Sequence, residues 1–385
     1  MNVIRGYKAE IDPNNKQRTL LLKHAGAARW TYNWGLSEKK KAFDAKEKTP
    51  NAIELHRRLN LLKKTEIPWM YEVSKCCGQE ALRNLDRAFD NFFRRCKQKV
   101  KGKKGFPKFK SKHKGIGSFR LTGTIKVTDK TIQLPRLGCL RLKEHGYFPT
   151  NAKILSSTVS EQAGRWYVSI QVEEYRPEPS NKPEAVVGVD LGIKTLVVCS
   201  DGIIWDNPKA LRSRLRKLKH LQRCASRRLK GSKNRKKAVK KLARLHQKIG
   251  NVRKDTLNKI TTQLTKTKSK IVIEDLNVSG MMKNHCLAQS IADLGLHEFR
   301  RQLDYKGKLY GCQIIVADRF FPSSRLCREC GVINENLTLA DRTWTCDCGA
   351  VHDRDMNAAK NLESLAASLS ERLNDCGEDS PLAVA

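Results

Sequence analysis

Acidic residues end two of the most apolar segments of this chain, and another acid begins a run of small residues. Asp190 follows Val186–Val189, Glu274 follows Ile271–Ile273, and Asp355 lies within the sequence HDRDMNAAKN. Short β-branched runs of this kind are typical of buried strands. Burying a carboxylate beside such strands costs free energy unless a partner compensates its charge. The pattern therefore predicts a sheet whose strand ends bring acids together for a shared purpose.

A divalent cation is the partner that such acids favour. Hard cations such as Mg²⁺ bind carboxylate oxygens and usually also substrate phosphate. Taken singly, Asp190 could be an ordinary strand-end residue before a turn, and Glu274 could be a helix cap. Taken together in so basic a chain, the acids indicate phosphate chemistry.

The charge balance predicts a polyanionic partner. The chain has 76 Lys and Arg against 39 Asp and Glu, which gives a net charge of +37 over 385 residues. Such an excess repels itself unless nucleic acid or a membrane surface neutralises it. The sequence has no apolar run of about 18 residues and no signal-peptide core. We therefore expect a nucleic-acid-binding protein of the cytoplasm, with no membrane partner.

Two segments concentrate the positive charge. Residues 94–114 contain eleven Lys or Arg and residues 209–254 contain twenty, with no acid in either, and the second segment predicts two basic helices. A charge run is usually a solvated face, but runs without counter-charges favour phosphate binding. Phe106, Phe109 and Trp344 could stack on bases or anchor loops. The predicted nucleic-acid contacts in these segments are Lys103, Lys104, Lys108, Lys110, Arg227, Arg228, Lys236 and Lys237.

A further pair of candidate contacts lies near a helix start. Lys75 and Gln79 are four residues apart, so they project together from a helix that carries Leu82 and Leu85. Gln can hydrogen-bond the edge of adenine, and Lys can contact guanine or a phosphate. The alternative is an ordinary solvated helix start.

Four of the thirteen cysteines are clustered. Cys327 and Cys330 are followed, after fifteen residues, by Cys346 and Cys348. This spacing predicts a structural Zn²⁺ ion in a ribbon held by four thiolates. The second pair is separated by one residue rather than two, and His352 could replace one thiolate. The other cysteines are scattered, and we interpret them as reduced thiols because the chain is long and lacks a secretion signal.

The order of these motifs resembles a known family. Ribonuclease H-like nucleases have a similar order of elements: a strand ending in Asp, a hairpin, a strand ending in Glu, a further strand, and a helix that begins with Asp. The whole chain resembles the TnpB family, whose members are relatives of the type V CRISPR effectors. The motifs that carry the resemblance are the helix at 79–93, GFPKFK at 105–110, GVDLG at 188–192, IEDL at 273–276, and the cysteine ribbon running into HDRDMNAA at 352–359.

The resemblance implies a function and a site. It implies a transposon-encoded, RNA-guided DNA endonuclease of the prokaryotic cytoplasm or nucleoid, with Asp190, Glu274 and Asp355 as the catalytic acids of a RuvC domain that binds two Mg²⁺ ions. Its partners would be a guide RNA from the transposon end and target double-stranded DNA, read beside a short motif. The choice of Asp355 over Asp353 comes from the resemblance alone. Alternatives are a DNA strand transferase of transposition and a nuclease-inactive RNA-guided DNA-binding protein.

The predicted fold is α+β with several domains. A β-barrel, the wedge-like domain, is expected from residues 1–13 and 115–180, and a helical recognition domain from residues 14–114. A ribonuclease H-like (RuvC) α/β domain is expected from residues 181–324 and 352–368, with the basic helical hairpin and the zinc ribbon (325–351) as insertions. The tail, residues 369–385, is expected to be disordered.

Overall fold

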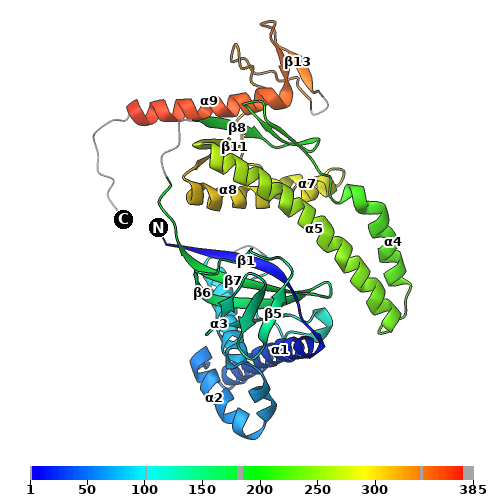
Figure 1. The fold of residues 1–385 in the computed structure, drawn as a ribbon. Helices are drawn as coiled ribbons and strands as arrows, with labels where there is room; N and C mark the ends of the chain where they lie inside the picture. The colour runs from blue at the N-terminus through cyan, green and yellow to red at the C-terminus, as the bar shows by residue number, and fades with distance from the viewer. Residues whose placement is uncertain (1, 100–101, 180–184, 339–340, 376–385) are drawn as a thin grey trace. The chain divides into compact units, whose positions relative to one another are not determined.

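The computed structural model describes residues 2–99, 102–179, 185–338 and 341–375. The chain forms two compact units, residues 1–177 and residues 178–385 (Figure 1). Each unit has its own sheet and its own hydrophobic core.

The first unit contains an open antiparallel sheet of seven strands. Their order is β2-β6-β7-β1-β5-β4-β3. No pairing joins the edge strands β2 and β3 within the described part of the chain, so the predicted closed barrel is wrong. Closure needs edge strands that pair along their length, and β3 has only two residues. The strands are β1 (Asn2–Asp12), β2 (Ser118–Leu121), β3 (Lys126–Val127), β4 (Thr131–Leu134), β5 (Gly138–Leu142), β6 (Lys153–Gln162) and β7 (Arg165–Tyr175).

Helices from the predicted helical domain, residues 14–114, pack against one face of this sheet. Leu21 and Ala25 of α1 share a core with Val168 and Ile170 of β7. Helix α1 begins with a capping box in which the side chain of Asn14 accepts the backbone N–H of Gln17. The helices of this unit are α1 (Asn15–Asp44), α2 (Ala52–Thr65) and α3 (Lys75–Lys97), with the short 3₁₀ turns η1 (Pro68–Glu72) and η2 (Lys112–Lys114).

The second unit contains a mixed sheet of five strands in the order β10-β9-β8-β11-β12. Strand β8 is parallel to β11, and β11 is parallel to β12, whereas β9 and β10 are antiparallel to their neighbours. The two apolar runs that precede Asp190 and Glu274 form β8 and β11, as predicted. The strands of this sheet are β8 (Val186–Asp190), β9 (Thr195–Cys199), β10 (Ile204–Asp206), β11 (Lys270–Ile273) and β12 (Gln313–Val316).

Helices cover both faces of this sheet. Val187 and Ile271 face a core shared with α5 (Lys233–Thr267), α7 (Ala288–Leu294) and α8 (Leu296–Tyr310). Gly295, with a φ of 76°, separates α7 from α8. Remaining helical elements before β12 are η3 (Arg212–Arg214), α4 (Leu215–Ser226), which packs against α5, and α6 (Val278–Met281).

Helix α9 (Arg354–Asp375) covers the opposite face and packs closely on β8. Gly188 permits this approach, because a Cβ atom there would lie 1.9 Å from the carbonyl oxygen of Ala359. Helix α9 continues to Asp375, into the first residues of the tail that we expected to be disordered. Residues 376–385 of that predicted tail lie outside the described residues.

A two-stranded sheet, β13 (Thr343–Thr345) and β14 (Val351–Asp353), precedes α9. The ring of Trp344 is buried with Cys327 and Cys346, so it anchors this small element rather than stacking on a base. Among the helices that the structure describes, none is long and apolar enough to cross a membrane.

Candidate active site and metal centres

The three predicted catalytic acids lie at one edge of the second sheet. Ile273 pairs with Val189 across the parallel strands β11 and β8, so Glu274 and Asp190 follow paired residues at the same strand ends. Asp355 lies in the first turn of α9, the helix that packs on β8. Burial, with repulsion from Glu274 and Asp355, raises the pKa of Asp190 to about 8. The three carboxylates are therefore near enough to interact.

Neighbouring side chains hold two of these acids. The Ser323 hydroxyl donates a hydrogen bond to Glu274, and the Ser323 carbonyl accepts one from the amide of Asn361 on α9 at 2.8 Å. Ser323 thus connects the loop after β12 to both β11 and α9. Nothing in the local sequence of Ser323 indicates this role.

Asp355 is paired with two arginines. Its carboxylate lies 3.3 Å from the guanidinium of Arg342 and 3.2 Å from that of Arg354. Arg342 belongs to the segment between the cysteine pairs, and its carbonyl accepts the N–H of Arg354 at 2.7 Å. The start of α9 and the cysteine-bearing element are therefore connected at this acid.

Asp353 has a different position from Asp355. It is exposed, and its carboxylate accepts the backbone N–H of Met356 at 2.9 Å. This is the geometry of a helix N-cap. The tertiary structure thus distinguishes two acids that are only two residues apart.

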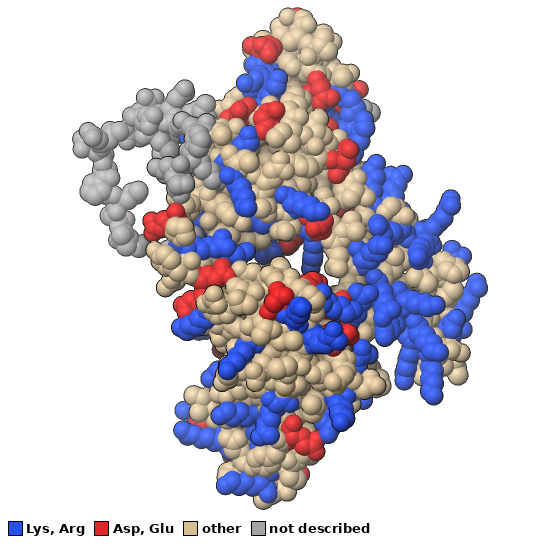
Figure 2. Space-filling model, viewed as in Figure 1, with Lys and Arg blue, Asp and Glu red and all other residues tan. Residues whose placement is uncertain are grey.

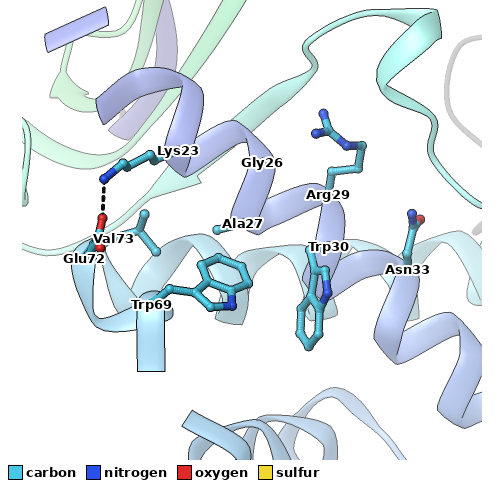
Figure 3. Close-up of a pocket in the computed structure, with 9 residues that line it drawn as sticks. All are labelled: Lys23, Gly26, Ala27, Arg29, Trp30, Asn33, Trp69, Glu72 and Val73. Carbon is cyan, nitrogen blue, oxygen red and sulfur yellow. Dashed lines mark hydrogen bonds and ion pairs between the residues drawn. The ribbon is translucent and has the colours of Figure 1, made fainter. Parts of the chain in front are cut away.

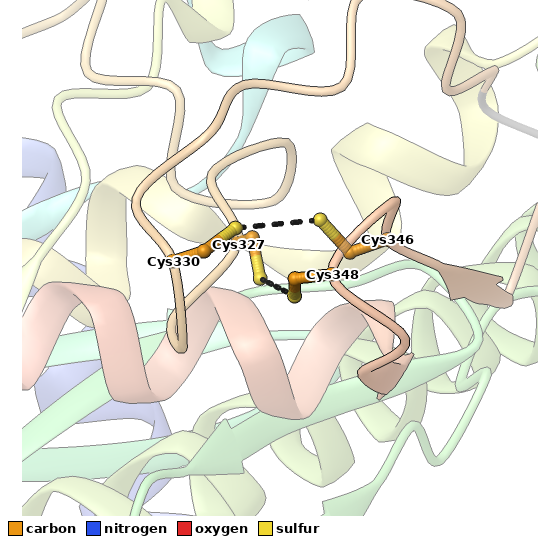
Figure 4. Close-up of side chains that lie close together, drawn as sticks. All are labelled: Cys327, Cys330, Cys346 and Cys348. Atoms are coloured by element: carbon orange, nitrogen blue, oxygen red, sulfur yellow. Dashed lines mark hydrogen bonds between the residues drawn. The ribbon is translucent and has the colours of Figure 1, made fainter.

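The four clustered cysteines form a tighter group than the acids. One sulfur atom from each of Cys327, Cys330, Cys346 and Cys348 lies within 4.8 Å of the others, and within the described ranges no three acids, histidines or cysteines elsewhere are grouped so closely. The sulfurs of Cys330 and Cys346 are 3.5 Å apart, and those of Cys327 and Cys348 are 3.8 Å apart (Figure 4). This donor set suits Zn²⁺.

Tight turns explain how a one-residue spacing is accommodated. The N–H of Gly349 donates to the carbonyl of Cys346 at 2.8 Å, and the N–H of Cys346 donates to the carbonyl of Ala350 at 2.8 Å. Gly349 has a φ of 85°, a conformation that favours glycine. The turn between β13 and β14 therefore brings Cys346 and Cys348 to the same side.

His352 contacts this cluster through one cysteine. Its Nε2 atom lies 3.1 Å from the sulfur of Cys327, and its ring packs against Trp344 with centroids 4.8 Å apart. Burial raises the pKa of the Cys327 thiol, but hydrogen bonds from the backbone of Cys330 and from His352 bring it down to about 6. A lowered thiol pKa favours the thiolate that binds metal.

The predicted phosphate contacts of the second unit are exposed around the turn between α4 and α5. Figure 2 shows Lys and Arg side chains gathered over α4 and the adjoining end of α5. Arg227 and Arg228 directly follow α4, Lys236 and Lys237 lie near the start of α5, and all four are exposed.

In the first unit the basic segment after α3 is anchored by an aromatic ring. Phe106 packs edge-on against Phe92 with ring centroids 5.2 Å apart, so it is an anchor. Lys103, Lys104 and Lys108 are exposed, as is the ring of Phe109, but the ammonium of Lys110 lies 3.9 Å from the ring centroid of Tyr32, and burial lowers its pKa. Lys110 is therefore partly committed to the protein itself.

Lys75 and Gln79 line the same cavity of about 930 Å³ in the first unit. Thr122, Gln133 and Arg136 of the sheet region line it as well. The structure thus supplies hydrogen-bonding groups opposite the helix start that the sequence singles out.

Three family models match this chain. A model described as "Probable transposase" (OrfB_IS605) matches residues 169–285, a "Cas12f1-like, TNB domain" matches residues 297–362, and a "Helix-turn-helix domain" (HTH_OrfB_IS605) matches residues 1–48. Together they cover the start of the first unit and most of the second.

Relatives match over nearly the whole length. A Streptomyces pristinaespiralis protein named "Putative RNA-guided DNA endonuclease" is 38% identical to this chain. The match covers 98% of this chain and 92% of the length of the relative. Escherichia coli InsQ, which carries the same description, is 31% identical to this chain. The match covers 98% of this chain and 95% of the length of InsQ.

A solved structure shares the fold. The protein in "Cryo-EM structure of the Cas12f1-sgRNA-target DNA complex" is 13% identical, with a TM-score of 0.56, over 94% of this chain and 99% of its own. This likeness concerns the fold, while the sequence relatives identify the family. By full-length identity and by matching models, the chain belongs to the TnpB family.

Proposed function

We propose that this protein is an RNA-guided DNA endonuclease whose nuclease centre contains Asp190, Glu274 and Asp355. One observation carries the proposal: three acids from distant parts of the chain lie at one sheet edge, where burial, with repulsion from Glu274 and Asp355, raises the pKa of Asp190 to about 8. A chain with a net charge of +37 has a surface suited to polyanions. We infer the RNA-guided reaction from the names of the relatives, which describe RNA-guided DNA endonucleases.

The acids fit Mg²⁺ in their chemistry. Carboxylate oxygens are the ligands this cation prefers, and positive charge would offset the repulsion that Glu274 and Asp355 exert on Asp190. Two bound Mg²⁺ ions would supply activation of water and stabilisation of the leaving oxygen. Asp355 would release Arg342 and Arg354 on binding metal, while the Ser323 hydroxyl keeps Glu274 oriented.

We assign the ribbon, residues 325–351, to a structural Zn²⁺ ion held by the four thiolates, within a nuclease domain of residues 181–324 and 352–368. The ribbon leads directly into α9, and its Arg342 contacts Asp355. Zinc would therefore stabilise the segment that positions the third acid.

Guide RNA and target DNA would bind the exposed cations of both units. The cavity at Lys75 and Gln79 would read the motif beside the target, because glutamine and lysine can contact base edges. The guide RNA would derive from the transposon end.

The decisive experiment purifies the protein with its own RNA and sequences that RNA. The complex is then given plasmids with a matching target beside a randomised motif. We expect Mg²⁺-dependent double-strand cleavage at targets that match the RNA. Cleavage that ignores the RNA sequence, or no cleavage at any matching target, would contradict the proposal.

The same library tests motif reading. Gln79→Ala should relax motif preference and lower cleavage, while Gln98→Ala, a change at the C-cap of α3, should leave both unchanged. An unaltered preference in Gln79→Ala would remove this residue from the motif site.

Strand transfer is the second candidate, because the family model over residues 169–285 is described as "Probable transposase". It predicts that cleaved ends join to a second DNA. Joined products formed without RNA would favour it over the endonuclease.

A further inference from the structure

A second cavity of the first unit has walls of tryptophan. It has a volume of about 530 Å³ and lies between α1 and η1. Trp30 of α1 and Trp69 of η1 form its walls, and Gly26 and Ala27 of α1 also line it (Figure 3). We call it the tryptophan pocket. Its volume is within the range of protein sites for small ligands.

The two indole rings leave an aromatic surface open. Trp30 stacks on Trp34 with centroids 6.1 Å apart, and Trp69 meets Trp30 at 88° with centroids 5.9 Å apart. Trp69 is 42% exposed and lies outside the apolar cluster formed by Leu55, Leu59 and their neighbours. Its ring therefore contributes little to the core, although indole is among the side chains that gain most from burial.

The basic segment passes along one edge of this pocket. The guanidinium of Arg29 donates to the carbonyl of Ile116 at 3.1 Å, and the amide of Asn33 exchanges two hydrogen bonds with the backbone of Lys110, at 2.9 and 2.8 Å. Both Arg29 and Asn33 line the pocket. Exposed lysines on this segment, Lys108 and Lys112, can contact phosphates beside it.

The other end of the pocket is polar. Lys23 and Glu72 form an ion pair there, with side chains 49% and 53% exposed. The pair presents both a donor and an acceptor to the pocket. The pocket suits a nucleotide in three ways. The aromatic wall matches the face of a base, the polar end matches the hydrogen-bonding edge of that base, and the neighbouring lysines match its phosphate.

We propose that the tryptophan pocket binds one unpaired nucleobase of a single strand whose phosphates lie along residues 108–116. The base packs against Trp69, and its edge meets Lys23 and Glu72. This inference rests on the proposed function, which supplies RNA and unwound DNA as sources of single strands. Stacking on aromatic rings tolerates any base, so the pocket adds affinity rather than sequence selectivity.

The sharpest test fills the pocket without disturbing the core. A Cβ atom on Gly26 has no neighbour nearer than Nη2 of Arg29, at 4.0 Å, so Gly26→Leu places its side chain in open space. Leucine also favours a helix over glycine. Gly250→Leu is the matched control, because Gly250 is a helical glycine of α5 with nothing within 4 Å.

The measurement is the affinity of full-length protein for a 12-nucleotide RNA and for the same backbone with abasic sugars, with matched DNA strands as a second arm. Wild-type protein and Gly250→Leu should prefer the base-bearing strand by about tenfold, a typical stacking contribution. Gly26→Leu and Trp69→Ala should reduce that preference to about twofold, and Trp69→Phe should restore it. The arm with the larger preference identifies the source of the base.

An undiminished base preference in Gly26→Leu would overturn the pocket assignment. Binding of the abasic strand reports separately on the basic surface. If wild-type protein binds neither strand, the proposed function fails as well, whereas equal binding of both strands contradicts the pocket alone.

Discussion

The two candidate metal centres of this protein are built in opposite ways. The cysteine cluster comes from one short segment, residues 327–348, and its sulfurs all lie within 4.8 Å. The acids come from residues 190, 274 and 355, and they interact without being so closely grouped. Local turns position the thiols, whereas a whole sheet and a helix position the acids.

The difference fits the two kinds of metal site that we propose. A structural zinc site is closed and compact, and it stabilises the segment that makes it. A catalytic Mg²⁺ site must leave room for substrate and water, so its ligands depend on the surrounding fold. Damage to the acids should therefore abolish chemistry with little effect on folding, while damage to the thiols should affect folding first.

The largest expected effect concerns the acids. Asp190→Ala, Glu274→Ala and Asp355→Ala should each lower DNA cleavage by on the order of a thousandfold, because a lost ligand removes transition-state charge stabilisation. RNA binding and zinc content should stay near wild type. Plasmid cleavage with matched RNA measures this.

Asp353→Ala is the matched control for Asp355→Ala. It removes a helix cap worth about 1 kcal/mol and should still cleave. If Asp353→Ala were inactive and Asp355→Ala active, the assignment of the third acid would be wrong.

The next effect concerns the glycine under α9. In Gly188→Ala, the new Cβ atom would lie 1.9 Å from the oxygen of Ala359 and 2.6 Å from the nitrogen of Glu363. Helix α9 must shift, which moves Asp355 and should destabilise the unit by about 1–3 kcal/mol. We expect cleavage to fall at least about tenfold.

Thermal unfolding and cleavage assays measure the two effects of Gly188→Ala, and Gly250→Ala is the control because its Cβ atom meets nothing. Wild-type stability and activity in Gly188→Ala would show that the contact between α9 and β8 does not position the acid.

A smaller effect on cleavage is expected from the thiols. Elemental analysis should find about one zinc per chain. Cys327→Ser should lose that zinc and lower the thermal stability of the ribbon, with a loss of cleavage smaller than that of the acid variants. Dialysis into Mg²⁺-free buffer should instead stop cleavage reversibly and leave zinc bound. Full zinc content in Cys327→Ser would contradict the four-thiolate site.

The smallest effect tests whether His352 is a ligand or a neighbour of one. Because its Nε2 atom lies 3.1 Å from the sulfur of Cys327, His352→Ala should weaken zinc binding by about tenfold, as loss of a ligand's hydrogen-bond partner does. Cys348→Ala should lose zinc altogether. A competition titration with a zinc chelator measures both. The reverse order would make His352 the fourth ligand.

Several features were predictable from the sequence because their causes are local. The apolar runs before Asp190 and Glu274 predicted β8 and β11, since strand propensity and burial act over a few residues. The cysteine spacing predicted a cluster that two tight turns assemble. The prediction that three acids share a purpose also came from the sequence, because the pattern placed two of them after buried strands.

Other features needed tertiary contacts. Only the packing of α9 separates Asp355 from the capping Asp353, only the loop after β12 brings Ser323 to Glu274, and Trp30 and Trp69 meet from different elements. The open sheet follows from short edge strands, and α9 extends beyond the end we predicted. Motifs reflect short-range preferences of the chain, whereas these contacts join residues far apart in sequence. Only the folded structure could therefore show which of these residues meet.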